Sequence, residues 1–437
     1  MKSLSLSLQR PLALLLIVVL LIAAVPVVTA QGSAVGTVTA NLNMRSGPGT
    51  GYARIGLIPY NTTVSLAGRD ATGAWLYGST PGGMTGWMFG TYVNVDAAAV
   101  LALPVMDASA GTSSGGTSAQ PAAAPATTAG GFELGGHVRT FGYTSYMQTA
   151  GMTWAKVQVR YTYGQSASDV AGLISEAHAN GFRILLGIVG DPGQLASIPD
   201  YITQYAAFVG GAAALGADGI EVWNEMNIDR EWPQGRIDPN WYVQMLSAAY
   251  NSIKANNGNT LVISGALSPT GAEGAFGTDR VWNDDRYVAG MAAAGAAQYM
   301  DCIGVHYNEG IIAPSQRTGD PRGDTHYSRY FWGMMDTYWN AFGGARPLCF
   351  TELGYVTPEG YGTLPAGFAW GQNTTLSQQA AWLAEAASLA RSSGRVRLMI
   401  IWNVDFLGFA GEDPQGGYAI VRPDGSCPAC TALDGVM

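Results

Sequence analysis

The sequence predicts an α/β fold, a (β/α)₈ barrel, preceded by a small all-β barrel. The chain has 437 residues, which is long enough for a barrel of about 250 residues and an accessory module. Beyond Gly131, apolar strand-like runs alternate with helical patterns. Between Thr37 and Val95, short strand-like runs are instead separated by Gly, Pro and Asn turns, as in small β-barrels.

The first 30 residues have the pattern of a secretory signal peptide. Lys2 and Arg10 precede an apolar run, and small residues follow at Val28-Thr29-Ala30, where a signal peptidase would cut. We therefore expect a secreted protein that begins at Gln31. An uncleaved N-terminal anchor is the only membrane alternative, because no later stretch approaches the roughly 20 uninterrupted apolar residues of a membrane helix.

The predicted small barrel carries specific motifs. They are Leu42-Asn43-Met44-Arg45-Ser46-Gly47-Pro48-Gly49-Thr50, Gly68-Arg69-Asp70, Trp75 and Gly86-Trp87. Together these resemble the bacterial SH3-like domain, and the resemblance implies a module at residues 37–95 that binds cell-wall peptides or glycans. In the alternative interpretation, Trp75 and Trp87 are simply core residues of that barrel.

Residues 96–130 are expected to form a flexible linker. From Ala108 to Gly130 the chain contains only Ala, Gly, Ser, Thr, Pro and one Gln. A segment without charged or aromatic residues cannot bury enough surface to fold. It would hold a catalytic domain within reach of a wall-bound module.

The alternation after residue 131 consists of eight strand-like runs and intervening helices. The strands are expected at Phe132–Val138, Ala155–Tyr161, Arg183–Val189, Gly219–Asn224, Thr260–Ala266, Cys302–His306, Pro347–Glu352 and Leu398–Asn403. This count favours a (β/α)₈ barrel over residues 131–437. The alternative is a doubly wound open sheet, which is disfavoured because no Gly-rich phosphate loop follows the first strand.

Composition narrows the class of partner. The formal net charge is −9, so the surface would repel nucleic acid but not a neutral glycan. The spacing of Cys427 and Cys430 suits a metal site, a redox pair or a local disulfide, and an oxidising compartment favours the disulfide. His137, His178 and His326 lack metal-ligand spacing, no G-x-S-x-G elbow appears, and we predict no cofactor.

Polar residues gather at the predicted strand ends, where such a barrel carries its active site. They are Arg160, Asn224, Glu225, His306, Tyr307, Glu352, Trp402 and Asn403. Glycoside cleavage needs two carboxyls, one to protonate the departing oxygen and one to meet the positive charge on the sugar carbon. Glu225 and Glu352 are the candidates, and Glu221, on the same strand face as Glu225, competes with it.

This pattern resembles the clan A glycosidases, the superfamily of family 5 and family 39 enzymes, which place Asn-Glu after strand four and a second Glu after strand seven. The resemblance implies Glu225 as general acid/base and Glu352 as nucleophile. It implies further that Asn224 binds the sugar 2-hydroxyl, that Trp402 forms the floor under the ring, and that Arg160 supports Glu352 electrostatically.

The implied roles require different charge states. Glu225 must carry a proton, so we expect Trp223 and Met226 beside it to raise its pKa. Glu352 must stay ionised, and we expect Arg160 and Tyr307 to keep it so.

The sequence departs from the clan's pattern at three places. Met226 stands where proline usually follows Asn-Glu, and no histidine occurs in strand three. His306 and Tyr307 are adjacent instead of being separated by one residue. Because adjacent strand residues face opposite ways, we expect only one of them to reach the site. His306 is favoured, with Tyr307 close behind.

These observations predict a secreted, wall-tethered retaining glycosidase that acts on a poly- or oligosaccharide, with no nucleic-acid partner. Two alternatives stay open. The barrel could bind carbohydrate without cleaving it, or the chain could be a peptidoglycan-binding scaffold whose functional part is the SH3-like module.

Overall fold

The computed structural model describes residues 34–106 and 131–437, apart from residues 40, 50, 51, 53, 71, 410 and 411. The chain divides into two compact units, with the boundary after Ser118. The expected signal peptide and residues 107–130 of the expected linker lie outside the described residues. In the described part of the chain, no helix combines the length and the apolar character needed to cross a membrane.

The first unit is a seven-stranded antiparallel sheet with the order β3-β2-β6-β5-β4-β1-β7. Its strands are β1 (Ala34–Val38), β2 (Leu42–Arg45), β3 (Arg54–Ile58), β4 (Thr63–Arg69), β5 (Trp75–Ser79), β6 (Thr85–Phe89) and β7 (Val93–Asn94), with a 3₁₀ turn η1 (Gly90–Tyr92). Buried and exposed residues alternate along β4, because one face of the sheet covers the core. The predicted small all-β barrel is confirmed.

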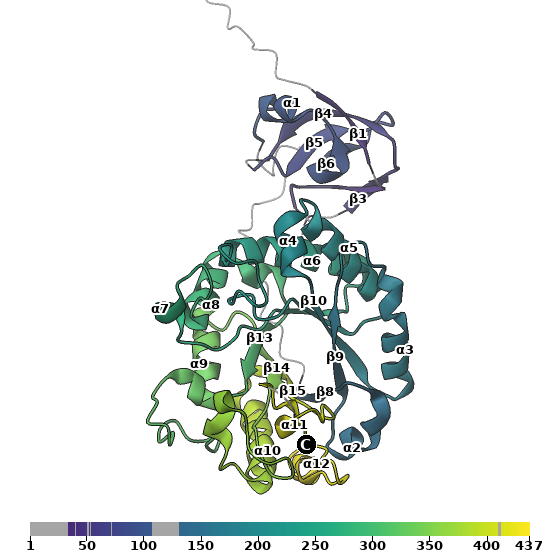
Figure 1. Ribbon diagram of the computed structural model, residues 1–437. Coiled ribbons are helices and arrows are strands. Elements are labelled where there is room, and N and C mark those ends of the chain that lie inside the picture. Colours follow the sequence, from purple (N-terminus) through teal and green to yellow (C-terminus); the bar gives the residue numbers. More distant parts are fainter. Residues whose placement is uncertain are drawn as a thin grey trace, which may run out of the picture. The chain divides into compact units, whose positions relative to one another are not determined.

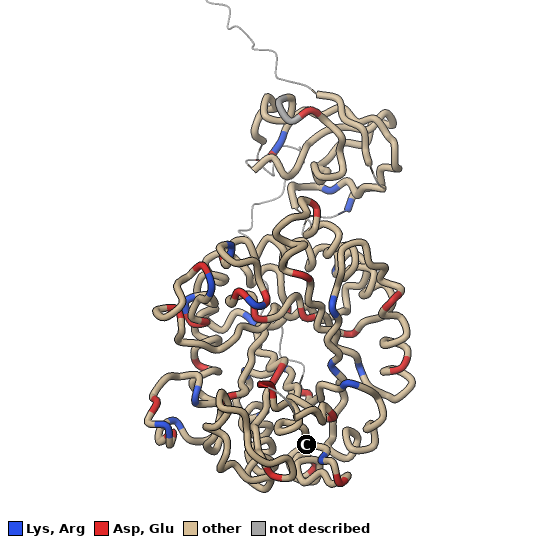
Figure 2. The backbone as a smooth tube through the Cα atoms, viewed as in Figure 1, with Lys and Arg blue, Asp and Glu red and all other residues tan. Residues whose placement is uncertain are grey.

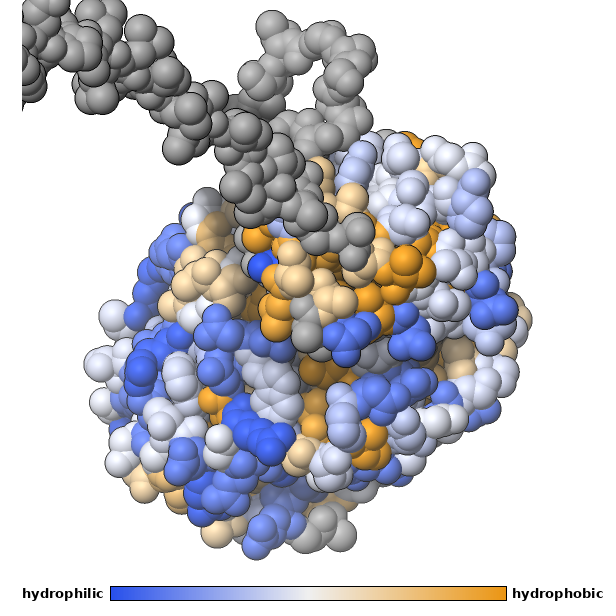
Figure 3. All heavy atoms as spheres, turned by 90° about the horizontal axis from the view of Figure 1, so that it is seen from above, coloured by the Kyte–Doolittle hydropathy of each residue, from blue (hydrophilic) through white to orange (hydrophobic). Residues whose placement is uncertain are grey.

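The two tryptophans of this unit differ in exposure. Trp87 is fully buried, whereas Trp75 is half-buried and lies against Phe89. Trp87 is therefore a core residue. Large apolar side chains remain exposed on this unit, among them Val35, Ile55 and Tyr60. On the face of the molecule drawn in Figure 3, orange apolar residues lie among blue polar ones.

The chain after β7 stays ordered longer than expected. Residues 97–102 form helix α1 (Ala97–Ala102), which begins because the Asp96 side chain accepts a hydrogen bond from the Ala99 amide. Beyond it, the Met106 amide donates to the Arg69 carbonyl at 2.8 Å, and Val105 forms an isolated parallel bridge with Arg69 at the end of β4. The expected linker start at residue 96 is therefore wrong, since residues 96–106 belong to the first unit.

The second unit is a ring of eight parallel strands surrounded by helices (Figure 1). The strands are β8 (Glu133–His137), β9 (Trp154–Arg160), β10 (Arg183–Val189), β11 (Gly219–Val222), β12 (Leu261–Ser264), β13 (Ile303–Tyr307), β14 (Leu348–Leu353) and β15 (Val396–Ile401). They follow the order β12-β11-β10-β9-β8-β15-β14-β13. The Ser264 amide donates to the Cys302 carbonyl at 3.1 Å and nearly closes the ring. The predicted (β/α)₈ barrel is confirmed.

Helices follow the strands and cover the outside of the ring. They are α2 (Thr144–Thr149), α3 (Ala171–Ala179), α4 (Pro192–Ser197), α5 (Tyr201–Ala214), α6 (Pro239–Asn256), α7 (Glu273–Phe276), α8 (Asp284–Ala293), α9 (Phe331–Ala341), α10 (Leu376–Ser393), α11 (Gln415–Tyr418) and α12 (Pro428–Asp434), with 3₁₀ turns η2 (Phe141–Tyr143), η3 (Ala167–Val170), η4 (Ala296–Tyr299), η5 (Tyr327–Arg329) and η6 (Ala366–Gly371). Local signals set their ends: Thr375 and Gln378 form a capping box at the start of α10, and Gly394 ends it in the left-handed conformation.

The second unit contains two disulfides. Cys427 and Cys430 are bonded to each other, which confirms the expected local bridge. Cys302 and Cys349 form the second bridge across neighbouring strands, with 5.8 Å between their Cα atoms. Among the residues that the structure describes, no group of three or more side chains could hold a metal ion.

Candidate active site

Glu225 lies in the turn that follows β11. The backbone there is unusual, because Trp223 and Glu225 both have positive φ angles, 73° and 45°. Non-glycine residues in this region cost on the order of 1–3 kcal/mol each, and surrounding contacts must hold them. The Trp223 indole donates to the Glu231 carbonyl at 2.7 Å, and the Glu225 amide donates to the Ala266 carbonyl at 2.8 Å. The turn is thereby fixed to the end of the neighbouring strand.

Glu352 lies within β14, one residue from its end, and its side chain faces the inside of the ring. The Asn308 amide donates to its carboxylate at 3.2 Å. The Lys156 ammonium lies 3.6 Å from the same carboxylate, and ring nitrogens of His137 and His306 each lie at 3.9 Å. These partners come from β8, β9 and the end of β13 with its following loop, so the fold itself surrounds Glu352.

His306 joins the two glutamates. Its Nδ1 atom lies 3.3 Å from Glu225 and 3.9 Å from Glu352. The two nearest carboxylate oxygens are therefore no farther apart than the sum of these two distances. Burial lowers the pKa of His306, but the charges of Glu352 and Glu225 and the hydrogen bond to Glu225 outweigh it and leave the pKa raised. Strand ends that are far apart in sequence thus meet at one mouth.

Glu221 does not compete for the role of Glu225. It is fully buried, and its carboxylate contacts Lys156 at 2.8 Å and accepts a hydrogen bond from the Thr351 hydroxyl at 2.7 Å. The glycine at position 187 gives this pair its room: a Cβ there would lie 3.2 Å from the Lys156 side chain and 3.4 Å from the Glu221 carboxylate. Glu221 therefore serves as the counter-charge of a buried lysine.

The expectation that apolar neighbours raise the pKa of Glu225 is wrong for this arrangement. Burial does raise it, but the hydrogen bond and charge of His306 and the guanidinium of Arg230 outweigh burial, and the pKa is lowered. Arg230 donates to Glu225 at 2.8 Å. Trp223 turns away to pack against Tyr205 and Trp232.

Two expected site residues lie elsewhere. Arg160 donates to Glu231 at 3.1 and 3.4 Å, and Lys156, four residues earlier on the same face of β9, is the cation that reaches Glu352. Arg160 ends β9, so its side chain extends past the rim and is 59% exposed. Tyr307 follows His306 on β13 and faces the opposite way; its hydroxyl donates to the Arg329 carbonyl, away from the carboxylates.

Asn224 and Trp402 do lie at the mouth. Asn224 is buried beside Glu225. Trp402 is half-buried, and its ring lies edge-on to His137 at 4.8 Å, next to Glu352. Of the eight residues expected at strand ends, the structure thus brings five together at the site: Glu225, Glu352, Asn224, His306 and Trp402. Asn403 instead bonds to the backbone, because its side chain donates to the Gln415 carbonyl and accepts from the Phe406 amide.

Several buried polar atoms at this mouth have no hydrogen-bond partner within the described protein. They are Asn224 Oδ1, His306 Nε2, His137 Nδ1 and Asn308 Oδ1. Buried polar atoms are nearly always paired, so unpaired ones at a site call for an explanation. This set includes both acceptors and ring nitrogens, which suits a ligand rich in hydroxyl groups.

Three site residues were missed from the sequence. Lys156 gave only a weak signal, because it alternates with apolar residues in the predicted strand just as Gln158 and Arg160 do. His137 is the last residue but one of the first predicted strand, Phe132–Val138, and ends the observed strand β8. Asn308 follows β13 in a loop, and nothing in the sequence places its side chain.

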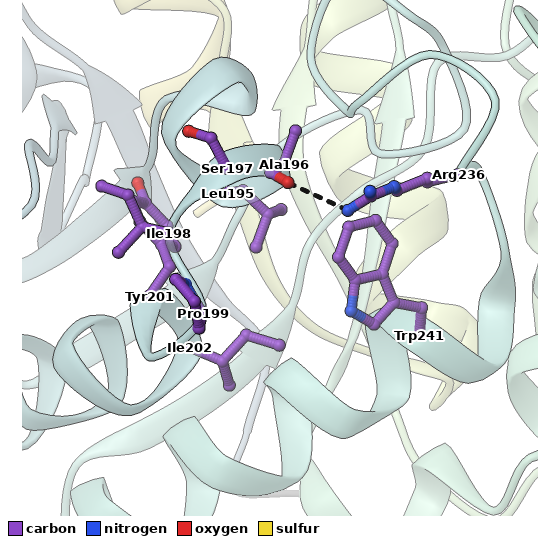
Figure 4. A pocket seen from close by; sticks show the side chains of 9 residues that line it. All are labelled: Leu195, Ala196, Ser197, Ile198, Pro199, Tyr201, Ile202, Arg236 and Trp241. Carbon is purple, nitrogen blue, oxygen red and sulfur yellow. Dashed lines mark hydrogen bonds between the residues drawn. The ribbon is translucent and has the colours of Figure 1, made fainter.

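Two hollows elsewhere on the second unit do not include Glu225 or Glu352. One of about 210 Å³ is lined by Leu195, Ile198, Ile202 and Trp241, and Arg236 donates across it to the Ala196 carbonyl (Figure 4). The other, of about 390 Å³, lies between loops after β12 and β13. Charged residues are sparse along the chain (Figure 2), which makes the cluster at the mouth distinctive.

Comparison with known proteins identifies a domain within the first unit. Residues 40–94 match the family model of the bacterial SH3 domain, so the first unit is such a domain. No curated protein matches the chain.

Solved structures similar to this chain include a family 39 glycoside hydrolase from the gut symbiont Bacteroides cellulosilyticus WH2, at 14% identity and a TM-score of 0.47, covering 92% of this chain and 76% of that one. Thermotoga maritima Cel5A in complex with mannotriose is 12% identical, with a TM-score of 0.44 and coverage of 72% and 100%. The Rhizomucor miehei endo-1,4-β-mannanase is 10% identical, with a TM-score of 0.45 and coverage of 70% and 94%. Similarities at this level carry no functional argument.

Proposed function

We propose that the second unit is a retaining glycoside hydrolase that cleaves O-glycosidic bonds of a poly- or oligosaccharide. The observation that carries the proposal is the contact of one His306 nitrogen with both Glu225 and Glu352. Retaining enzymes separate their two carboxyls by about 5 to 5.5 Å, and two carboxyls that share one ring nitrogen are compatible with that spacing. The unpaired polar atoms at the mouth support a hydroxyl-rich ligand.

In this proposal the two glutamates act in sequence. Glu225 protonates the departing oxygen while a carboxylate oxygen of Glu352 bonds to the sugar carbon and the glycosidic bond breaks. Glu225, now ionised, takes a proton from water, whose oxygen replaces Glu352 at the carbon. Lys156 and Asn308 stabilise the Glu352 carboxylate before it attacks and again when water displaces it, and Trp402 lies under the ring.

A glycan screen tests this function. The mature chain, from Gln31, is incubated with plant, fungal and bacterial glycans, and released oligosaccharides are measured. Glu352→Gln should lose nearly all activity, whereas Glu176→Gln, an exposed glutamate on α3, should lose none. NMR of the product in the first minutes should show retained configuration at the anomeric carbon. Binding of a glycan without release of sugars would instead favour the carbohydrate-binding alternative, and inverted product would overturn the nucleophile.

We further propose that the protein is secreted and that its SH3 domain retains it on cell walls. The signal-like first 30 residues and the domain itself support this. Removing residues 31–130 should weaken retention on isolated walls and leave the turnover of short soluble substrates nearly unchanged. An equal loss of both would contradict this division of labour.

A further inference from the structure

Arg230 contacts Glu225 in a way that the proposed mechanism does not use. One carboxylate oxygen of Glu225, Oε1, lies 3.3 Å from His306 Nδ1, and the other, Oε2, accepts from Arg230 at 2.8 Å. Both oxygens of the proposed proton donor are thus already bound. A carboxyl that donates a proton must carry it on an oxygen that faces the leaving group, so one of these contacts has to break.

The two contacts differ in how easily they can break. His306 is buried on a strand and lies between two carboxylates. The Arg230 side chain is 71% exposed and extends from the loop after Glu225. The oxygen on the solvent side is therefore Oε2, where a departing sugar would lie and where Arg230 now is.

Arg230 also has a second acceptor at hand. Its Nε atom lies 3.8 Å from the Glu231 carboxylate, which is buried and held by Arg160. A small rotation would move the guanidinium from Glu225 to Glu231 without leaving the cation unpaired. The two acceptors between which the guanidinium would move, Glu225 and Glu231, thus both lie within 4 Å of Arg230.

We propose that Arg230 is a positioning residue which holds Glu225 as a carboxylate and has to move to Glu231 before Glu225 can protonate a leaving group. This inference rests on the proposed function, because it concerns the proton of the same glutamate. It adds a regulated step: the acid is loaded only when Arg230 releases it.

The charged groups around Glu225 fit this step. They are His306 from β13, Glu352 from β14, Glu221 from β11, Lys156 from β9, and Arg230, Glu231 and Arg160 at the rim. Lys156 and Glu221 compensate each other, so His306 and Arg230 are the groups that favour the carboxylate. When Arg230 leaves, burial of Glu225 is opposed by His306 alone, and its pKa rises.

Direct titration of Glu225 tests the inference without any activity. The full chain is labelled with glutamate carrying ¹³C at the carboxyl carbon, and the Glu225 signal is identified by its absence in Glu225→Gln. Arg230→Gln should shift the pKa of Glu225 upward. Arg317→Gln, which removes another exposed, ion-paired arginine, should leave it unchanged. Glu231→Gln should shift it downward, because Arg230 then has Glu225 as its remaining acceptor.

Kinetics supply a second readout. On natural glycans, Arg230→Gln should move the alkaline limit of kcat/KM to higher pH, and Glu231→Gln should lower kcat. Aryl glycosides with good leaving groups should show neither effect on the first step. An unchanged pKa of Glu225 in Arg230→Gln would overturn the inference even if sugars are released. If instead the pKa shifts as expected but no glycan is cleaved, the contact is established and the proposed function fails.

Discussion

The two glutamates of the candidate site are held in opposite ways. Glu352 lies on strand β14, at a point where the register with both neighbouring strands shifts, and its partners Lys156, His137 and Asn308 belong to the barrel wall or its rim. Glu225 lies in a turn with left-handed backbone, and a largely exposed arginine contacts it. The fold fixes the surroundings of Glu352, whereas a single surface contact can change those of Glu225.

This difference matches the chemistry proposed for each residue. A nucleophile must be a carboxylate before it attacks and again when water displaces it, and buried cations and hydrogen-bond donors beside it favour that state. A general acid/base must hold a proton in one step and lack it in the next. An environment that changes with the position of one side chain suits that requirement better than a rigid one.

The largest effect is expected from Glu225→Ala. Positioned proton transfer contributes about 10² to 10⁴-fold, so turnover of natural glycans should fall by this order, while aryl glycosides with good leaving groups should lose much less in the first step. Azide should restore part of the second step. Rates on both substrate types show the difference, and a uniform loss would assign Glu225 a structural role.

Lys156→Met should sharpen the contrast in stability. Removing the buried cation leaves the buried Glu221 carboxylate without its ion-pair partner, and breaking a buried pair costs about 3–5 kcal/mol of unfolding free energy. Urea denaturation measures this, and Lys156→Met combined with Glu221→Gln should recover part of the loss. Lys254→Met is the matched control, because its partner Asp301 is partly exposed. Equal losses in both lysine variants would mean that the buried Lys156 contributes no more to the unfolding free energy than the partly exposed Lys254 does.

Asn308→Ala should affect Glu352 more mildly. A hydrogen bond to a charged group contributes about 1.5–3 kcal/mol, so kcat/KM should fall by roughly ten- to a hundredfold. The loss should be similar for good and poor leaving groups, unlike that of Glu225→Ala. The exposed Asn340 provides the control, and a loss confined to poor leaving groups would place Asn308 with Glu225.

The same contrast explains what the sequence could predict. All eight strands, and with them Glu225, Glu352, Asn224, His306 and Trp402, follow from apolar runs and from counting which residues end them. Arg160 does not contact Glu352 as expected, because counting strand ends identifies residues at the rim of the barrel. It does not give the depth at which a side chain enters the ring. Lys156, four residues earlier on the same face, has the right depth.

The pKa of Glu225 could not be predicted for a different reason. Trp223 and Met226 are neighbours in sequence, but the left-handed turn points the Trp223 ring into the helix layer. Arg230 reaches Glu225 only because the loop folds back over five residues. The residues next to Glu225 in the sequence are therefore not the groups that lower its pKa.

The smallest effects are expected from pH, and they separate the two histidines that flank Glu352. Carboxylates raise the pKa of His306, whereas burial, Lys156 and His306 lower that of His137 well below its usual value. The folded protein thus prefers protonated His306, whose stabilising contribution is complete below about pH 6.5, the usual value, and is lost as pH rises through the raised pKa. His137 behaves oppositely, because the unfolded chain takes up its proton below about pH 6.5, and its contribution is lost as pH falls.

To measure this difference, we would compare unfolding free energies of the wild type, His306→Gln and His137→Gln. The range is about pH 5 to 9, which spans the usual histidine pKa. Subtracting each variant from the wild type cancels the titrating groups that do not interact with the replaced histidine. The His306 difference should shrink as pH rises, and the His137 difference should grow as pH rises toward neutrality. Parallel trends would mean that burial alone sets the pKa of both histidines. Glu225 and Glu352 would then not favour a proton on His306 Nδ1.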